Sequence, residues 1–311
     1  MHRMTRASVL ILLVAGLPLA GLTVPASADT GYVYVVDRAL VGGGRVIRVN
    51  RATGAQKVIS ADRRFDDPFG IALESDGDIL VADQDAMGGQ GAIFRVKPST
   101  GRTTVVSSGG RFEAPSGIDV QESGAILVAD PKAFDTLGGV IRVHPVTGKQ
   151  TVVSARGKFE NPRGLAVAPG GAIYVADEHA FGGPGGVIRV NPTTGGQRTI
   201  SVGDDFRNPL GIDARTMTTV IVGDENAYGG PGGVIGVNVS SGAQTRIGSA
   251  DLLDTVSGVA ELSNGKVLVA MQNGLQDDRG GIVRISRQTG AQVVVSAGGS
   301  FRDPVDLVLA G

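Results

Sequence analysis

The sequence predicts an all-β protein, a six-bladed β-propeller of four-stranded antiparallel blades. A unit of 47 residues recurs, because Pro68, Pro115, Pro162 and Pro209 each open a Pro-x-Gly tripeptide at that spacing. An aspartate closes a Val-Ala-Asp-like strand in five of the six units, Met271 takes its place in the last, and a Thr-Gly or Ser-Gly turn recurs at nearly the same period. Each unit contains four short strands joined by glycine-bearing turns, the pattern of a propeller blade.

The first 28 residues are predicted to be a signal peptide. Two arginines precede an apolar run from Ala7 to about Val24, and residues 25–28, Pro-Ala-Ser-Ala, follow as a small-residue cleavage pattern. An uncleaved membrane anchor is the alternative, but glycine and proline interrupt the run. The propeller domain is then residues 29–311, and we expect a secreted protein in the extracellular space, in the periplasm or at the cell surface.

Four strands are expected within each unit, labelled a to d in chain order. In the second unit they are Gly70–Glu74, Asp78–Asp83, Ala92–Lys97 and Thr103–Ser107. Strand a begins near the proline, which removes a backbone donor, and the glycine two residues later permits close approach near the crowded ring axis. The a–b turn (Ser-Asp-Gly) and the c–d turn (Pro-Ser-Thr-Gly) suit antiparallel hairpins.

The two ends of the chain predict how the ring closes. Gly31–Asp37 is a strand that no a strand precedes, whereas Pro304–Ala310 is an a strand with nothing after it. The last strand therefore completes the first blade, and this closure removes the open sheet edges.

Two adjacent stretches resemble a known repeat. Residues 162–167 (PRGLAV) and 171–177 (GAIYVAD) are similar to the NHL repeat. The wider group includes six-bladed lactonases of the SMP-30 and gluconolactonase type, amidating lyases, streptogramin lyases and non-catalytic scaffolds. The resemblance covers residues 30–311 and implies the fold. It leaves the chemistry open, because one propeller hosts many functions.

The repeated residues are interpreted as structural. We expect the strand-ending aspartates to fix turns, and we hypothesise that each also pairs with a strand c arginine of the preceding blade: Arg48–Asp83, Arg95–Asp130, Arg142–Asp177, Arg189–Asp224 and Arg284–Asp37. A large apolar residue three positions before the proline is expected to fill the core between blades: Phe65, Phe112, Phe159, Phe206, Leu253 and Phe301.

Candidate metal ligands lie in the b–c loops of blades 4 and 5. These loops and the d–a loops share the face around one channel mouth. Glu178 and His179 follow one strand-ending aspartate, and Glu225 and Asn226 follow the next. Carboxylate, imidazole and amide groups together can bind a divalent cation or serve as acid and base. A solvated His179 is the alternative.

Strand a supplies two further candidates. Asp119 and Asp213 stand where other blades carry alanine, and Asp306 replaces the repeat glycine of the closing strand. Innermost strands line the channel, so these carboxylates predict a site there for a divalent cation such as calcium, magnesium or zinc. Capping of backbone N–H groups is the alternative role.

Two further features concern the loops and the last blade junction. Met87, Phe134, Phe181 and Tyr228 recur in the b–c loops and form either a packed collar or an exposed apolar rim. The junction of blades 5 and 6 breaks several repeat series at once, which indicates either a partner surface or a relaxed seam.

These observations favour a secreted, non-catalytic binding or scaffold propeller, expected to be a monomer. Its ligand would be a protein, a glycan or a small molecule on the loop face. The net charge of −1 without a basic cluster excludes a nucleic-acid surface, and no membrane contact is expected once the leader is removed. The alternative is a metal-dependent lactonase or lyase at the channel mouth, although the lactonase ligands do not match residue by residue. A structural cell-surface protein that binds wall polysaccharide is a third possibility.

Overall fold

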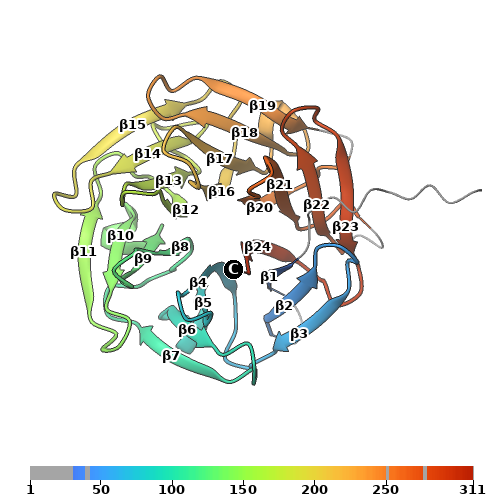
Figure 1. The fold of residues 1–311 in the computed structure, drawn as a ribbon. Helices are drawn as coiled ribbons and strands as arrows, with labels where there is room; N and C mark the ends of the chain where they lie inside the picture. Colours follow the sequence, from blue (N-terminus) through green and yellow to red (C-terminus); the bar gives the residue numbers. More distant parts are fainter. Residues whose placement is uncertain (1–30, 39–42, 250–251, 276–278, 311) are drawn as a thin grey trace, which may run out of the picture.

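The computed structural model describes residues 31–38, 43–249, 252–275 and 279–310. The predicted signal peptide lies outside these residues. The described chain forms 24 β-strands in six four-stranded sheets, arranged around a central channel (Figure 1). The fold is therefore the predicted six-bladed propeller.

The blades are numbered in chain order, and within each one the strands run from the channel outward. Blade 1 contains β24 (Pro304–Leu309), β1 (Tyr32–Asp37), β2 (Arg45–Asn50) and β3 (Gln56–Ser60). Blade 2 contains β4 (Pro68–Leu73), β5 (Ile79–Asp83), β6 (Ala92–Val96) and β7 (Thr103–Ser108). Blade 3 contains β8 (Ile118–Val120), β9 (Ile126–Asp130), β10 (Gly139–Val143) and β11 (Gln150–Ala155).

The second half of the ring repeats this order. Blade 4 contains β12 (Pro162–Val167), β13 (Ile173–Asp177), β14 (Gly186–Val190) and β15 (Gln197–Val202). Blade 5 contains β16 (Pro209–Asp213), β17 (Thr219–Asp224), β18 (Gly233–Asn238) and β19 (Gln244–Ser249). Blade 6 contains β20 (Val256–Glu261), β21 (Lys266–Met271), β22 (Gly281–Ser286) and β23 (Gln292–Ala297). Three b–c loops carry one short helical turn each: α1 (Ala86–Gly89), α2 (Ala133–Thr136) and η1 (Ala227–Gly229).

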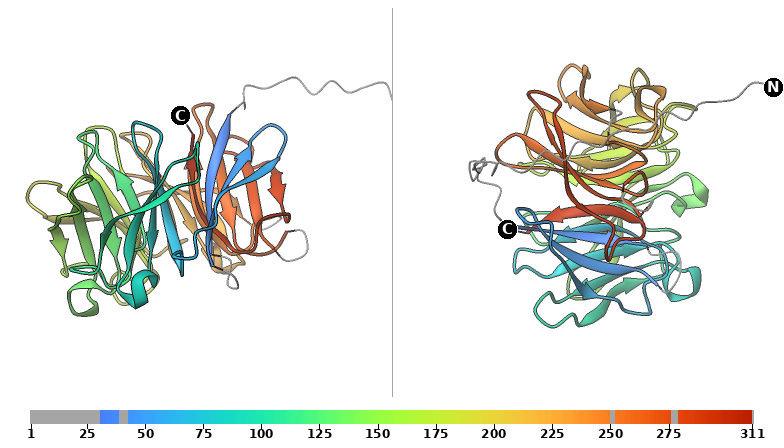
Figure 2. Two further views of the ribbon diagram at one scale, coloured as in Figure 1. Left: turned by 90° about the horizontal axis from the view of Figure 1, so that it is seen from below. Right: turned by 90° about the vertical axis from the view of Figure 1, so that its right-hand side faces the viewer.

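The ring closes as predicted. β24 pairs antiparallel with β1, so that Val33 faces Leu309 and Val36 faces Asp306. Figure 2 (right) shows this last strand beside the first strands of the chain. The inner strand of blade 2 begins at Pro68, two residues before the predicted Gly70, because Pro68 already faces Asp83 across a bulge.

The core lies in the seams between blades. Six apolar clusters fill the six seams, and each contains one of the predicted large residues, all at most 4% exposed. Second strands such as β5 and β9 are buried along their whole length, because neighbouring blades cover both of their faces. This explains why they read as continuous apolar runs rather than as alternating patterns. Among the described residues, no helix is long and apolar enough to cross a membrane.

The strand-ending aspartates hold loops within their own blade. The buried carboxylate of Asp83 accepts the backbone N–H groups of Asp66, Asp67 and Ala86 at 2.9–3.0 Å. It thereby joins the d–a loop to the b–c loop, and we call this arrangement the aspartate bracket. Equivalent brackets form at Asp130, Asp177 and Asp224, and Asp37 accepts the d–a loop N–H groups of Arg302 and Asp303.

The hypothesis that strand c arginines pair with these aspartates is wrong. Arg95 faces Leu80 in the β5–β6 ladder, three residues before the strand-ending Asp83, and therefore lies toward the opposite end of the blade. There its guanidinium pairs with Glu74 and donates to the carbonyl of Pro145 in the next blade at 3.1 Å. The equivalent arginine of blade 3 donates to a glutamine of its own blade and to a carbonyl of the next blade in the same way.

Neighbouring blades are instead fastened at the perimeter by glutamine and serine. The Gln150 amide donates to the Ser107 hydroxyl at 3.0 Å and to the Gly109 carbonyl at 2.9 Å. The Ser107 hydroxyl donates in turn to the carbonyl of Gly148 at 2.8 Å. We call this arrangement the glutamine–serine clasp, and it recurs for three further pairs: Gln197–Ser154, Gln244–Ser201 and Gln56–Ser296. In the sequence, each clasp is marked by a glutamine two residues after the turn glycine.

Candidate functional site

The inner strands define a channel with two unlike ends. The end at the b–c and d–a loops is called the loop mouth, and the end at the a–b turns is called the turn mouth. The strands approach so closely that a Cβ on Gly70, Gly117, Gly164 or Gly211 would overlap the backbone of the next blade. Glycine is required at this level because only a backbone without a side chain fits the narrowed ring.

Glu178 is the centre of a polar network at the loop mouth. Its Oε2 accepts hydrogen bonds from the Asn161 amide at 2.7 Å and from Arg163 Nε at 2.9 Å, and its Oε1 accepts one from the Asn208 amide at 3.2 Å. Asn208 belongs to the d–a loop of blade 5, so the network joins the two predicted blades. Three side chains of the protein itself therefore donate hydrogen bonds to the Glu178 carboxylate.

Arginine and phenylalanine side chains cover the channel at this end. The centroid of the Phe69 ring is 5.9 Å from the guanidinium group of Arg38 and 5.6 Å from that of Arg163. Arg38 also forms an ion pair with Asp303 at 2.8 Å. Within the part of the chain that the structure describes, a cavity of about 20 Å³ lies beneath Phe69 and Arg163. The loop mouth is therefore shallow, and a ligand there would contact these side chains rather than enter the channel.

Of the four candidates predicted at the loop mouth, Glu178 interacts with His179 and with Glu225, and the four differ in exposure. His179 Nδ1 is 3.4 Å from the Asn161 amide, and the His179 ring is half-exposed. Asn226 is exposed, while burial and then the neighbouring Glu178 raise the pKa of Glu225. Within the described residues, no three His, Cys, Asp or Glu side chains are grouped so as to hold a metal ion. Cation binding here stays a prediction.

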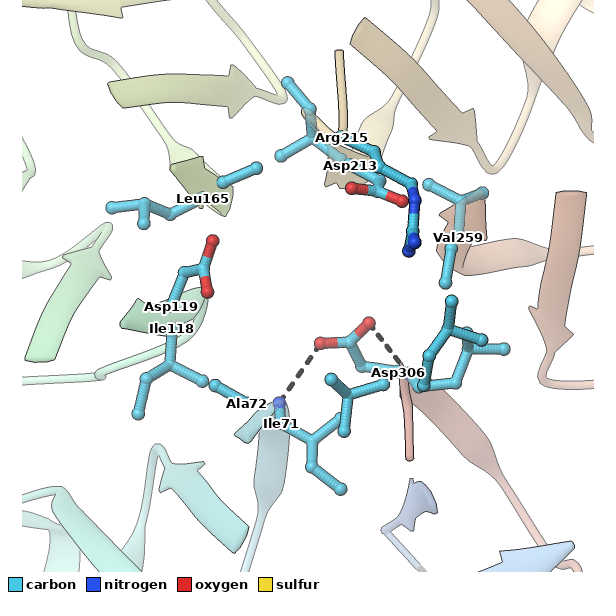
Figure 3. Close-up of a pocket in the computed structure, with 15 residues that line it drawn as sticks. Ile71, Ala72, Ile118, Asp119, Leu165, Asp213, Arg215, Val259 and Asp306 are labelled. Carbon is cyan, nitrogen blue, oxygen red and sulfur yellow. Dashed lines mark hydrogen bonds between the residues drawn. The ribbon is translucent and has the colours of Figure 1, made fainter. Parts of the chain in front are cut away.

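The other two candidates, Asp119 and Asp213, lie in a separate cavity of about 240 Å³ toward the turn mouth. Figure 3 shows their carboxylates and that of Asp306 directed into the lumen, with the Arg215 side chain beside Asp213. A wider depression of about 630 Å³ shares Asp213 and Arg215 and is otherwise lined by the a–b turns. The described channel is therefore more accessible from the turn mouth than from the loop mouth.

Each channel carboxylate caps the inner strand of the next blade. Asp119 accepts the N–H of Val167 at 2.7 Å, and Asp213 accepts that of Glu261 at 2.6 Å. Asp306 accepts the N–H of Ile71 at 3.1 Å. The three donors are on blades 4, 6 and 2, so the caps join alternate pairs of blades. The capping role is confirmed, while a cation in the channel stays a prediction.

Burial within the channel wall raises the pKa of these carboxyl groups. The pKa of Asp119 rises to about 6 and that of Asp306 to about 7, although backbone N–H bonds act in the opposite direction. Burial also raises the pKa of Asp213, which Arg215 partly counters. Mutual repulsion adds to the effect, because Asp119 and Asp213 both raise the pKa of Asp306.

The b–c loops present apolar side chains on three consecutive blades. Met87, Leu137 and Phe181 are 47%, 46% and 40% exposed, and we call these three residues the apolar rim. Met87 and Phe181 have φ near 60°, a left-handed conformation that is uncommon outside glycine. Phe134 and Tyr228 share this conformation but pack against core clusters. Phe134 and Tyr228 therefore match the predicted packed collar, whereas Met87 and Phe181 match the predicted exposed rim.

Sequence reasoning missed several residues at both mouths. Arg163 and Phe69 occupy the variable position between the proline and the glycine, and Asn161 and Asn208 precede the proline. Variation at fixed positions of a strict repeat was their only signal. Arg215 follows strand a of blade 5, where the repeat pattern gives no information.

No family model and no curated protein sequence matches this chain. Solved structures do resemble it. A chain in the crystal structure of a nidogen–laminin complex has a TM-score of 0.72 at 13% identity, covering 90% of this chain and 98% of that one. TolB from Acinetobacter baumannii has a TM-score of 0.69 at 13% identity, covering 91% and 67%. A gluconolactonase from Xanthomonas campestris has a TM-score of 0.58 at 18% identity, covering 78% and 84%.

At these identities the likeness shows the fold alone. The chain is a six-bladed β-propeller, and its overall architecture resembles that of these three solved structures.

Proposed function

We propose that this propeller is an exported, non-catalytic binding module that holds a partner protein on its loop face. The apolar rim carries the proposal, because three adjacent blades each expose one large apolar side chain there. Exposed apolar groups gathered on one face of a soluble protein mark interaction sites. Export is inferred from the predicted signal peptide.

The polar centre of the same face supports docking rather than catalysis. Glu178 is already bonded to Asn161, Asn208 and Arg163, and Arg38 is paired with Asp303. Such mutually bonded groups form a preorganised surface, which loses little side-chain freedom when a partner binds. An apolar contact beside a fixed polar network is the usual composition of a protein interface.

One observation favours the alternative, a metal-dependent lactonase or lyase. Glu178, Asn161 and Asn208 converge from two neighbouring blades within hydrogen-bonding distance. A half-turn of both amides would place two carbonyl oxygens beside the carboxylate, and calcium and magnesium prefer oxygen ligands of this kind. The same mouth would then hold a cation and, with it, a substrate.

Two measurements on the mature protein separate these functions. For the binding module, partners captured by cross-linking are purified and titrated against the wild type, a rim triple variant (Met87→Ser, Leu137→Ser, Phe181→Ser) and a control on the other face (Val146→Ser, Met217→Ser). We expect the rim variant to lose binding and the control to keep it. Equal binding by both variants would contradict the proposal.

For the enzyme, divalent metal content is measured by elemental analysis after dialysis, with Glu178→Gln and His179→Ala variants alongside the wild type. A stoichiometric ion that is lost in Glu178→Gln, together with hydrolysis of lactones, would replace the binding module by the enzyme. A folded protein without a stoichiometric ion and without lactone hydrolysis would support the binding module over the enzyme.

A further inference from the structure

The cavity at the turn mouth combines three kinds of lining. Every blade contributes aliphatic side chains to its wall, chiefly Ile71, Ile118, Leu165, Ile212, Val259 and Leu307, and Val308, Leu309 and three alanines add to them. Three carboxylates and one guanidinium complete the lining (Figure 3). Its volume of about 240 Å³ is below the roughly 300–1,000 Å³ typical of sites for drug-sized ligands. The cavity therefore suits a small metabolite.

The charged groups are distributed around the lumen instead of meeting at one point. Asp306, Asp119 and Asp213 come from blades 1, 3 and 5, and they bond to blades 2, 4 and 6. No three such side chains in the described residues are close enough to share one ion. A single metal ion would therefore be a poor match, whereas a molecule with several donor groups could span the lumen.

The carboxylates retain acceptor capacity toward the lumen. The two oxygens of Asp119 accept the N–H groups of Val120 and Val167, and those of Asp306 accept the N–H groups of Leu307 and Ile71. An ionised carboxylate offers about four lone-pair sites. Ammonium or guanidinium donors can therefore bond to these oxygens from the lumen without breaking the bonds between blades.

Arg215 adds the opposite charge at the open end of the cavity. Its side chain contributes to both the 240 Å³ cavity and the wider depression outside it, next to Asp213 (Figure 3). A guanidinium group donates but does not accept hydrogen bonds and matches a carboxylate in geometry. A ligand with cationic groups inside and a carboxylate toward the mouth would meet complementary charge along its whole length.

We propose that the turn-mouth cavity binds a small basic amino acid. Its ammonium or guanidinium groups bond to Asp119, Asp213 and Asp306, its alkyl chain packs against the aliphatic ring, and its carboxylate pairs with Arg215. This site is on the face opposite the apolar rim and does not depend on the partner-binding function proposed above.

Proton release provides a test beyond affinity. Among the described residues, the titratable groups that line the lumen are the three aspartates and Arg215, while β4, β12 and β20 contribute aliphatic side chains. Glu261 of β20 also raises the pKa of Asp213 and is itself paired with Arg287. A bound cation favours the ionised carboxyl form, and the pKa values of about 6 and about 7 leave part of Asp119 and Asp306 protonated near neutral pH. Binding is therefore expected to release protons, which calorimetry detects as a dependence of the heat on the buffer.

The experiment is isothermal titration calorimetry of the mature protein with L-lysine, L-arginine, 1,5-diaminopentane and L-norleucine. We expect lysine or arginine to bind and norleucine to bind poorly, because norleucine lacks the second cation. Asp119→Asn and Asp213→Asn each remove one charge-assisted bond, which corresponds to a loss of affinity of about 10-fold to 100-fold. Each keeps one amide oxygen for the N–H of the next blade, although Asp119→Asn gives up the bond from the Val120 N–H. Circular dichroism verifies that the fold survives.

Two further variants sharpen the assignment. Arg215→Gln should weaken the binding of the amino acid but leave the affinity for diaminopentane unchanged, because only the amino acid carries a carboxylate. Asp135→Asn, on an exposed loop-face side chain, makes the same change in net charge and should alter nothing. If neither L-lysine nor L-arginine binds, the proposal is wrong. It is also wrong if Asp119→Asn and Asp213→Asn both leave the affinity unchanged. Loss of affinity in the rim triple variant would show that the ligand binds on the other face.

Discussion

Replacing Asp130 by alanine tests whether the aspartate bracket stabilises a blade. The buried side chain accepts the N–H groups of Glu113 and Ala114 on one loop and of Lys132 and Ala133 on the other, at 2.8–3.2 Å. Each buried N–H left without an acceptor costs about 1–3 kcal/mol. Water that enters the loops offsets part of this cost. We therefore expect Asp130→Ala to lower the free energy of unfolding by about 3–5 kcal/mol.

Urea unfolding followed by far-UV circular dichroism measures this change, and the slope of free energy against urea should stay the same. The matched control is Asp135→Ala on the same loop. Its carboxylate is 79% exposed and is paired only with Arg156 on the surface, so the expected loss is below about 1 kcal/mol. A loss below about 1 kcal/mol for Asp130→Ala, at constant slope, would refute the reasoning, because a bracket of buried bonds cannot be that weak.

Three further outcomes follow from the seams and the channel. Because the pKa values of Asp306 and Asp119 are raised to about 7 and about 6, the folded state binds protons more tightly than the unfolded state. These groups should therefore add stability as pH falls through those values toward 3.8, and Asp306→Asn should reduce this gain in melting temperature. Gln150→Ala removes the two clasp bonds of this side chain and the one that it accepts from the Arg111 N–H, and it should cost about 1–2 kcal/mol in a urea titration. Gly164→Ala, whose Cβ would overlap a carbonyl of the next blade, should cost about 1–3 kcal/mol, whereas Gly183→Ala meets no atom and should melt as the wild type does.

The sequence predicted the blades and their closure because both follow from spacing. Proline and glycine at a period of 47 residues fix where each inner strand enters the ring, and the half-units at the two ends can only complete one another. The arginine–aspartate hypothesis failed because periodicity alone does not say which end of a blade a side chain occupies. The register of the β5–β6 hairpin determines the end of the blade at which the arginine lies, since it places Leu80 rather than Asp83 opposite Arg95.

The candidate sites were predicted only in part. Asp119 and Asp213 stand out where other blades carry alanine, so the sequence located them on the channel wall. The depth of the lumen depends on side chains from non-neighbouring blades, such as Phe69 and Arg163 at the loop mouth. No linear pattern reports how these meet, and the sequence therefore assigned the channel opening to the loop face although the larger cavity opens at the turns.

The junction of blades 5 and 6 shows how irregular positions act together. At the other five seams, a Cβ on the turn glycine would overlap the outer strand of the preceding blade, whereas at Gly290 the corresponding carbonyl lies 3.8 Å away. Gly248 stands here in place of the clasp serine, and Met271 replaces the bracket aspartate. A depression of about 370 Å³ lies at this seam. The loss of the serine thus coincides with a wider perimeter, as expected if clasps set the distance between blades. The apolar cluster beneath, which includes Leu253 and Met271, still closes the seam, because burial of apolar area is non-directional and tolerates a shift that hydrogen bonds do not.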